Sequence, residues 1–106
     1  MDTRLIAFKM KLIPGFEEEY EKRHREIWPE LVHLLKKSGI VDYSIFLDKD
    51  TSTLFAVQRV MGVKSSQSLG ENEIVKKWWA YMADIMETHQ NNSPISSPLQ
   101  EVFTLQ

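Results

Sequence analysis

Apolar residues recur with two different spacings along this chain, and the order of the two spacings constrains the fold more than any other feature. Every second residue is apolar in a half-buried strand, whereas apolar residues return after three or four positions in an amphipathic helix. Strand-like alternation occurs in four segments, residues 4–12, 40–47, 53–60 and 99–105. Helical spacing occurs in two longer segments, residues 16–38 and 73–87. The predicted order is therefore strand, helix, strand, strand, helix, strand.

Proline, glycine and polar residues indicate where these segments end. Pro14 and Gly15 follow the first strand, and Gly39 follows the first helical segment. Pro29 lies inside that helical segment, where it lacks an N–H and clashes with the preceding turn. We therefore expect a kink there, or a second helix that begins at Pro29. Two polar stretches predict loops, the first with at most a weak helical turn: residues 62–72 and 88–98.

This order of elements is that of the ferredoxin-like (split βαβ) fold, an α+β architecture written βαββαβ. We expect a four-stranded antiparallel sheet with both helices on one face, in a single domain that spans residues 1–106. The other face then needs a cover, because a large apolar patch is unusual on a monomer. The residues predicted on that face are Ile6, Phe8, Met10 and Leu54 or Phe55. We therefore expect a homodimer with the sheets packed face to face, an assembly of the dimeric α/β barrel type.

Composition excludes several classes of function. The net charge is −2 and the 13 lysines and arginines are dispersed, whereas a nucleic-acid surface needs a basic stripe. No cysteine is present, which excludes disulfides, thiolate nucleophiles and cysteine metal sites. No apolar run approaches the roughly 20 residues of a membrane span, and the N-terminus lacks the continuous apolar run of a signal peptide. We expect a cytoplasmic protein with no nucleic-acid or membrane partner.

Candidate site residues occur where the helical pattern should carry leucines. Tyr20, His24 and Trp28 are spaced four residues apart, which places them on the core-facing stripe of one helix. Tyr43 on the second strand, and Trp78 with Trp79 on the last helix, would point into the same space. Phenols exchange hydrogen bonds with hydroxyl groups, and histidine transfers protons near neutrality. Indole faces pack on the C–H surfaces of sugar rings, so the set predicts a sugar pocket.

Structural explanations compete with this interpretation. Tyr20 and His24 could form an internally bonded core pair with about equal probability. Trp78 alone is more often a core residue, but the adjacent Trp79 cannot occupy the centre of the same narrow stripe. Trp28 beside Pro29 is interpreted as structural. The three histidines, His24, His33 and His89, are far apart in the sequence, so we expect no metal site.

Three segments, YEKRHREIWPEL, KKWWAYMADIM and NNSPISSPLQEVF, together resemble the L-rhamnose mutarotase family. The similarity spans nearly the whole chain and implies a homodimer of ferredoxin-like protomers. It also implies interconversion of the α and β anomers of L-rhamnose without a cofactor. The family's acid/base histidine matches His24, and its sugar-contacting tyrosines match Tyr20 and Tyr43. Its paired tryptophans match Trp78 and Trp79. The loop at residues 62–72 departs most from the family, whose members tend to carry a more acidic and aromatic segment there.

The chemistry expected from this resemblance is ring opening and reclosure. One group removes the proton of the anomeric hydroxyl while another protonates the ring oxygen, and rotation about C1–C2 precedes closure to the other anomer. We expect His24 to donate the proton to the ring oxygen, with Tyr20, Tyr43, Trp78 and Trp79 binding the sugar. Two alternatives remain open: a cofactor-free oxygenase or haem-degrading enzyme of the same fold, and a sugar-sensing module without catalysis.

Overall fold

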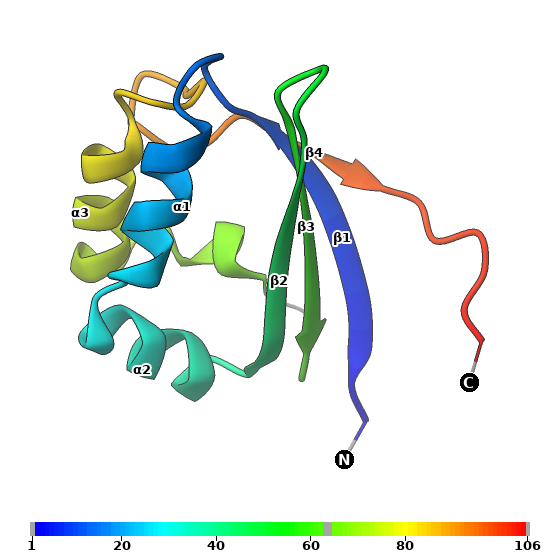
Figure 1. Cartoon of the computed structure of the whole chain (residues 1–106). Coiled ribbons are helices and arrows are strands. Elements are labelled where there is room, and N and C mark those ends of the chain that lie inside the picture. The colour runs from blue at the N-terminus through cyan, green and yellow to red at the C-terminus, as the bar shows by residue number, and fades with distance from the viewer. Residues whose placement is uncertain (1, 63–64, 106) are drawn as a thin grey trace.

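A computed structural model describes residues 2–62 and 65–105, and its strands form one antiparallel sheet in the order β2-β3-β1-β4 (Figure 1). The elements in chain order are β1 (Arg4–Lys11), α1 (Glu17–Arg25), α2 (Pro29–Lys37), β2 (Ile40–Asp48), β3 (Thr53–Val60), the 3₁₀ helix η1 (Ser66–Leu69), α3 (Glu73–Met82) and β4 (Ser96–Leu99). This arrangement confirms the ferredoxin-like prediction. The hairpin of β2 and β3 turns through residues 49–52, where Ser52 has a φ of 54°.

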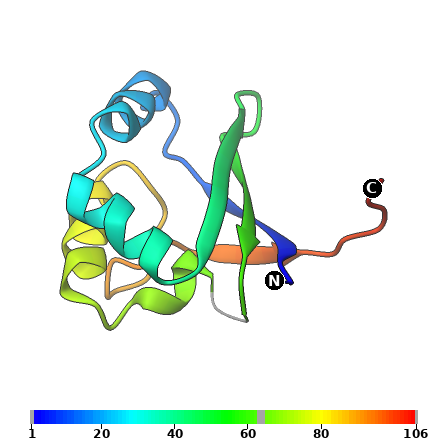
Figure 2. The ribbon, with the colours of Figure 1, turned by 90° about the horizontal axis from the view of Figure 1, so that it is seen from below.

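The helices all lie on one face of the sheet, as Figure 2 shows, and the hydrophobic core fills the space between them. β1 and β3 each direct alternate residues into this core, which gives their buried positions a period of two. The core residues contributed by the sheet include Phe8, Met10 and Leu54, and they pack with Leu31 of α2 and Met82 of α3.

The predicted assignment of sheet faces was wrong. Phe8, Met10 and Leu54 are buried under the helices, and Ile6 shares their side by alternation. Among the residues proposed for the opposite face, only Phe55 lies there, beside the exposed Phe46 on β2. The alternation of β1 was identified correctly, but the pattern does not say which apolar set faces the helices.

The first helical segment is two helices rather than one. α1 ends at Arg25, and Trp28 has an extended backbone, with a ψ of 130°, before Pro29 begins α2. A proline disfavours helical conformation in the residue before it and suits the first position of a helix, so it separates the two segments. The break expected at Pro29 is therefore confirmed, as a restart rather than a kink.

Two boundaries differ from the sequence prediction. α3 ends at Met82 rather than at residue 87, because the following residues bond to the end of β1: the Glu87 N–H donates to the Lys11 carbonyl at 3.1 Å. The last strand is β4 at Ser96–Leu99, paired with Ala7–Met10 of β1, rather than residues 99–105. β4 tolerates Pro98 because it is an edge strand, and the alternating tail beyond it extends away from the body (Figure 1).

Candidate active site

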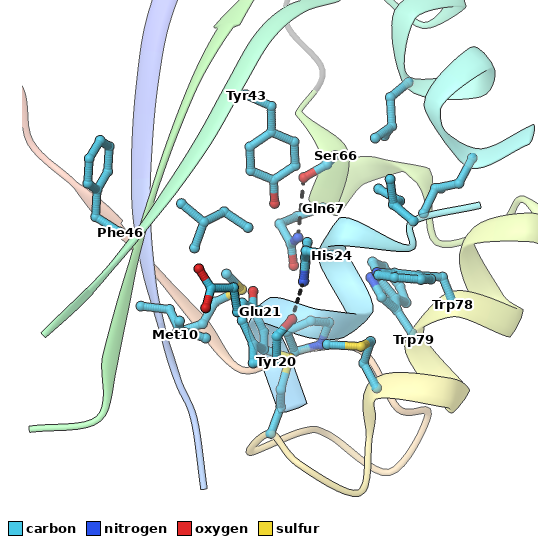
Figure 3. Close-up of a pocket in the computed structure, with 18 of the residues that line it drawn as sticks. Met10, Tyr20, Glu21, His24, Tyr43, Phe46, Ser66, Gln67, Trp78 and Trp79 are labelled. Carbon is cyan, nitrogen blue, oxygen red and sulfur yellow. Dashed lines mark hydrogen bonds between the residues drawn. The ribbon is translucent and has the colours of Figure 1, made fainter. Parts of the chain in front are cut away.

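A cavity of about 840 Å³ lies between the helices and the sheet, and Figure 3 shows part of its lining side chains. Its lining comes from β1, α1, α2, β2, β3, η1 and α3, so elements that are distant in the sequence meet at the cavity. The five residues expected to share a pocket all line it: Tyr20, His24, Tyr43, Trp78 and Trp79. Trp28, His33 and His89 are not among the lining residues.

The imidazole of His24 is held in one tautomer by its own helix. Its Nδ1 lies 3.0 Å from the backbone carbonyl oxygen of Tyr20, one turn earlier on α1. A carbonyl oxygen only accepts hydrogen bonds, so Nδ1 carries the hydrogen and Nε2 of the neutral ring has a free lone pair. Burial lowers the pKa of His24 below 6.5, against a smaller opposing effect of this hydrogen bond. The ring is therefore predominantly neutral at pH 7 and can accept a proton at Nε2.

The side chain of Tyr20 packs directly on His24, with ring centroids 4.4 Å apart. Burial, and secondly the nearby Tyr43 phenol, raise the pKa of Tyr20 well above 10. Burial likewise raises the pKa of Tyr43, and the polar side chains of Ser66 and Gln58 oppose the shift. Both phenols therefore stay uncharged near neutral pH and act as hydrogen-bonding groups.

Two adjacent tryptophans of α3 form the apolar wall. Trp78 meets His24 edge to face, with centroids 5.5 Å apart, and Trp28 meets Trp78 in the same way at 5.1 Å. Trp28 thus supports the wall from behind without lining the cavity. On the other side, the ring of Trp79 packs against Gly70, where no side chain separates the indole from the backbone.

Arg23 fixes α1 relative to α3. Its guanidinium bonds to Glu19 at 2.8 Å, to Asp84 at 2.9 Å and to the Tyr81 carbonyl at 2.8 Å, and it lies 4.5 Å from the centroid of the Tyr81 ring. The ion pair with Arg23 also lowers the pKa of Asp84. Because His24 follows Arg23 directly, these contacts of Arg23 hold the imidazole near the tryptophans of α3.

Several residues at the site escaped the sequence interpretation, among them the lining carboxylates Glu17, Glu18 and Glu21 of α1 and two polar residues of η1 and β3. Ser66 lines the cavity from η1, and Gln58 lies behind it, completely buried in β3. Gln58 did leave a signal in the sequence, because it is the only polar side chain among the inward positions Leu54, Ala56, Gln58 and Val60 of β3. Ser66 left none, since it belongs to a polar segment whose composition indicates a loop.

The side chains that line the cavity decide what it can bind. Within residues 2–62 and 65–105, no group of three or more histidine and carboxylate side chains could hold a metal ion. No helix among those residues is long and apolar enough to cross a membrane. What the cavity does offer is a neutral imidazole, two phenols and an indole wall, which can bind a small polyhydroxylated molecule and move a proton on it.

Comparison with known proteins agrees with this chemistry. A family model for L-rhamnose mutarotase matches residues 5–105. The L-rhamnose mutarotases of Bacteroides thetaiotaomicron and Phocaeicola vulgatus are 63% and 62% identical to this chain over 97 residues, covering 92% of this chain and 93% of each relative.

Solved structures extend the comparison to three dimensions. A crystal structure of L-rhamnose mutarotase from Formosa agariphila superimposes with a TM-score of 0.91 at 52% identity, covering 97% of this chain and 99% of that one. A Pseudomonas aeruginosa protein, 15% identical with a TM-score of 0.58, shares the fold alone, over 97% of this chain and 98% of that one. The chain therefore belongs to the L-rhamnose mutarotase family, isomerases that interconvert the anomers of rhamnose.

Proposed function

We propose that this chain interconverts the α and β pyranose forms of L-rhamnose, with His24 as the group that transfers the proton. The observation that carries the proposal is the free Nε2 of a neutral, half-buried imidazole on a cavity shared with two phenols and two indoles. Family membership favours this function over an oxygenase, a haem-degrading enzyme or a sugar sensor.

The proton movement can be written with His24 alone. Nε2 takes the proton of the anomeric hydroxyl, the C1–O5 bond breaks, and the imidazolium returns the proton to the ring oxygen O5. Both oxygens are attached to C1, so one imidazole can reach them in turn. Rotation about C1–C2 then presents the other face of the aldehyde, and the reverse steps close the ring to the other anomer. His24 thereby donates to the ring oxygen, as the sequence led us to expect, but it first acts as a base.

The remaining site residues bind and orient the sugar in this proposal. Tyr20 and Tyr43, both uncharged near neutrality, exchange hydrogen bonds with sugar oxygens. Trp78 and Trp79 pack on the C–H surfaces of the ring and on the C6 methyl group of rhamnose. Acid/base catalysis by one histidine supplies about 100- to 10,000-fold, which suffices for a reaction that already proceeds slowly in water.

Exchange between anomers is measured directly by saturation-transfer NMR on a panel of sugars. Irradiating one anomeric proton of L-rhamnose should reduce the signal of the other in proportion to enzyme concentration. The same measurement on fucose and lyxose compares their exchange rates with that of L-rhamnose. If L-rhamnose exchanges no faster with the protein than in buffer, the proposed function is wrong.

We also propose that two copies pack through the uncovered face of the sheet. Phe46 and Phe55 oppose each other across β2 and β3 on that face, and Leu5 and Leu99 add exposed apolar surface. The tail beyond β4 exposes Val102, Phe103 and Leu105 as well. Apolar area of this extent favours association. Elution as a monomer at micromolar concentration would contradict the homodimer. The cytoplasmic location expected from the sequence is a separate point and stays a prediction.

A further inference from the structure

The short helix η1 is anchored to the sheet through one buried amide. Gln58 of β3 is completely buried, and Ser66 at the start of η1 is buried as well. Oε1 of Gln58 accepts the backbone N–H of Ser66 at 3.2 Å, and Nε2 of Gln58 donates to the Ser66 hydroxyl oxygen at 2.6 Å. A backbone N–H can only donate, so it settles which way the amide is turned. These two hydrogen bonds fix Ser66 at the wall of the cavity.

Gln67, the next residue, enters the cavity from this anchored helix (Figure 3). Its backbone N–H donates to the Ser65 hydroxyl oxygen at 3.2 Å, and its side-chain Nε2 donates to the Ser66 hydroxyl oxygen at 3.4 Å. The second bond is longer than usual, so it orients the amide of Gln67 without immobilising it. Because Nε2 faces Ser66, the oxygen Oε1 is left as the acceptor of this side chain.

Oε1 of Gln67 is open to a ligand. Among residues 2–62 and 65–105, no group donates a hydrogen bond to it. In the same part of the chain, no completely buried side-chain oxygen lacks a partner, so Oε1 must be accessible. Figure 3 shows the amide directed into the cavity that Tyr43 and His24 also line. An amide oxygen only accepts hydrogen bonds, so the ligand group that suits it is a donor such as a hydroxyl.

The other acceptors of the cavity differ from this one. Glu18 and Glu21 also line it, but both residues are exposed, and Glu21 pairs with Arg25 at 3.5 Å. In the proposed function, Nε2 of His24 receives the proton of the anomeric hydroxyl. Gln67 therefore offers an uncharged acceptor, deeper than these two carboxylates, for a hydroxyl elsewhere on the sugar.

We propose that Gln67 is a substrate-binding residue that determines specificity, because its Oε1 accepts a hydrogen bond from a ring hydroxyl at C2, C3 or C4 of the sugar. The inference rests on the proposed function and deepens it by one contact. It also assigns a role to the segment 62–72, where the sequence departs most from the family. A sugar without that hydroxyl leaves Oε1 unpaired and is therefore bound more weakly.

Gln67→Met tests this contact, because methionine is an apolar side chain of similar length. Saturation-transfer NMR measures anomer exchange of L-rhamnose and of its 2-deoxy, 3-deoxy and 4-deoxy analogues, with the wild type and with the variant. For L-rhamnose, KM should rise about three- to tenfold with kcat nearly unchanged, as the loss of one neutral hydrogen bond in binding predicts. For one of the three analogues the same substitution should cost less than twofold, because the hydroxyl that Gln67 binds is already absent.

Ser65→Ala is the matched control. Ser65 caps η1 by accepting the Gln67 N–H but does not line the cavity, so its loss should affect all four sugars equally. Gln67→Ala gives the same comparison if methionine prevents folding. If the Gln67 substitution raises KM equally for all four sugars, or by less than twofold for L-rhamnose, the assignment of Gln67 is wrong while the proposed function stands. If the wild-type protein does not exchange L-rhamnose at all, the proposed function fails and this inference fails with it.

Discussion

Replacing Gly70 with alanine should displace one wall of the cavity by a distance that the structure specifies. Gly70 has ordinary right-handed backbone angles, φ −62° and ψ −14°, so alanine adopts them without strain. A Cβ placed there lies 2.9 Å from Cζ3 and 3.1 Å from Cη2 of Trp79. Ordinary contacts begin at 3.4 Å, so the indole must move by about 0.5 Å.

The energetic cost combines two opposing effects. Overpacking a well-filled site costs about 1–3 kcal/mol, while replacing glycine by alanine at a compatible conformation returns about 0.4–1 kcal/mol. We therefore expect Gly70→Ala to lower the free energy of unfolding by roughly 0.5–2 kcal/mol. A domain of this size loses about 4–8 °C in melting temperature for each kcal/mol. Because Trp79 lines the cavity, KM for L-rhamnose should rise as well.

Thermal melts and exchange kinetics are compared for the wild type, Gly70→Ala, Trp79→Phe and the double variant. The comparison separates the clash between the alanine Cβ at position 70 and the indole from other effects of the substitution. Trp79→Phe removes the ring atoms Cζ3 and Cη2, so Gly70→Ala added to Trp79→Phe should cost little or nothing further. An alanine variant that is more stable than the wild type would refute the packing argument. Equal destabilisation in both backgrounds would refute it too, because the cost would then not arise at the indole.

Three further predictions concern the wall, the imidazole and the assembly. Trp78→Phe should raise KM for L-rhamnose about three- to tenfold through loss of aromatic surface, with a smaller change in kcat; a fall in kcat alone would contradict a binding role. NMR titration should give His24 a pKa below 6.5, so the exchange rate should be constant above about pH 6.5 and fall as the pH drops through the folded pKa. The contribution of the neutral ring to the free energy of unfolding should be full above about pH 6.5 and should shrink as the pH falls toward the folded pKa. A measured pKa of His24 at or above 6.5 would contradict the burial argument. Phe46→Glu places a charge on the uncovered sheet face, where Phe46 is 64% exposed, so light scattering should report a monomer with native circular dichroism. A dimer mass that is unchanged would place the interface elsewhere.

Local chemistry in the sequence was sufficient to predict the order of elements and the gathering of five side chains. Pro29 predicted a break because its effect on the backbone is independent of the rest of the fold. Tyr20 and His24 stood out because polar groups on an apolar helix stripe need partners. Both inferences depend on residues within one helix turn, which the sequence displays directly.

The errors concern relations between distant segments. The face of β1 that the helices cover depends on how α1, α2 and α3 dock, and alternation alone is symmetric between the two faces. Residues 99–105 alternate like a strand, but β1 offers pairing only to Ser96–Leu99. The partner of Gln58 is set by η1, whose position follows from tertiary packing and not from its polar sequence.

The central claim is that a proton moves through Nε2 of His24, and His24→Gln tests it most directly. Glutamine can still hydrogen-bond near this position but cannot take and return a proton. Saturation-transfer NMR on L-rhamnose should show the enzyme-dependent exchange rate fall about 100- to 10,000-fold, while tryptophan fluorescence still reports sugar binding. Exchange at the wild-type rate in this variant would remove His24 from the reaction and contradict the proposed mechanism.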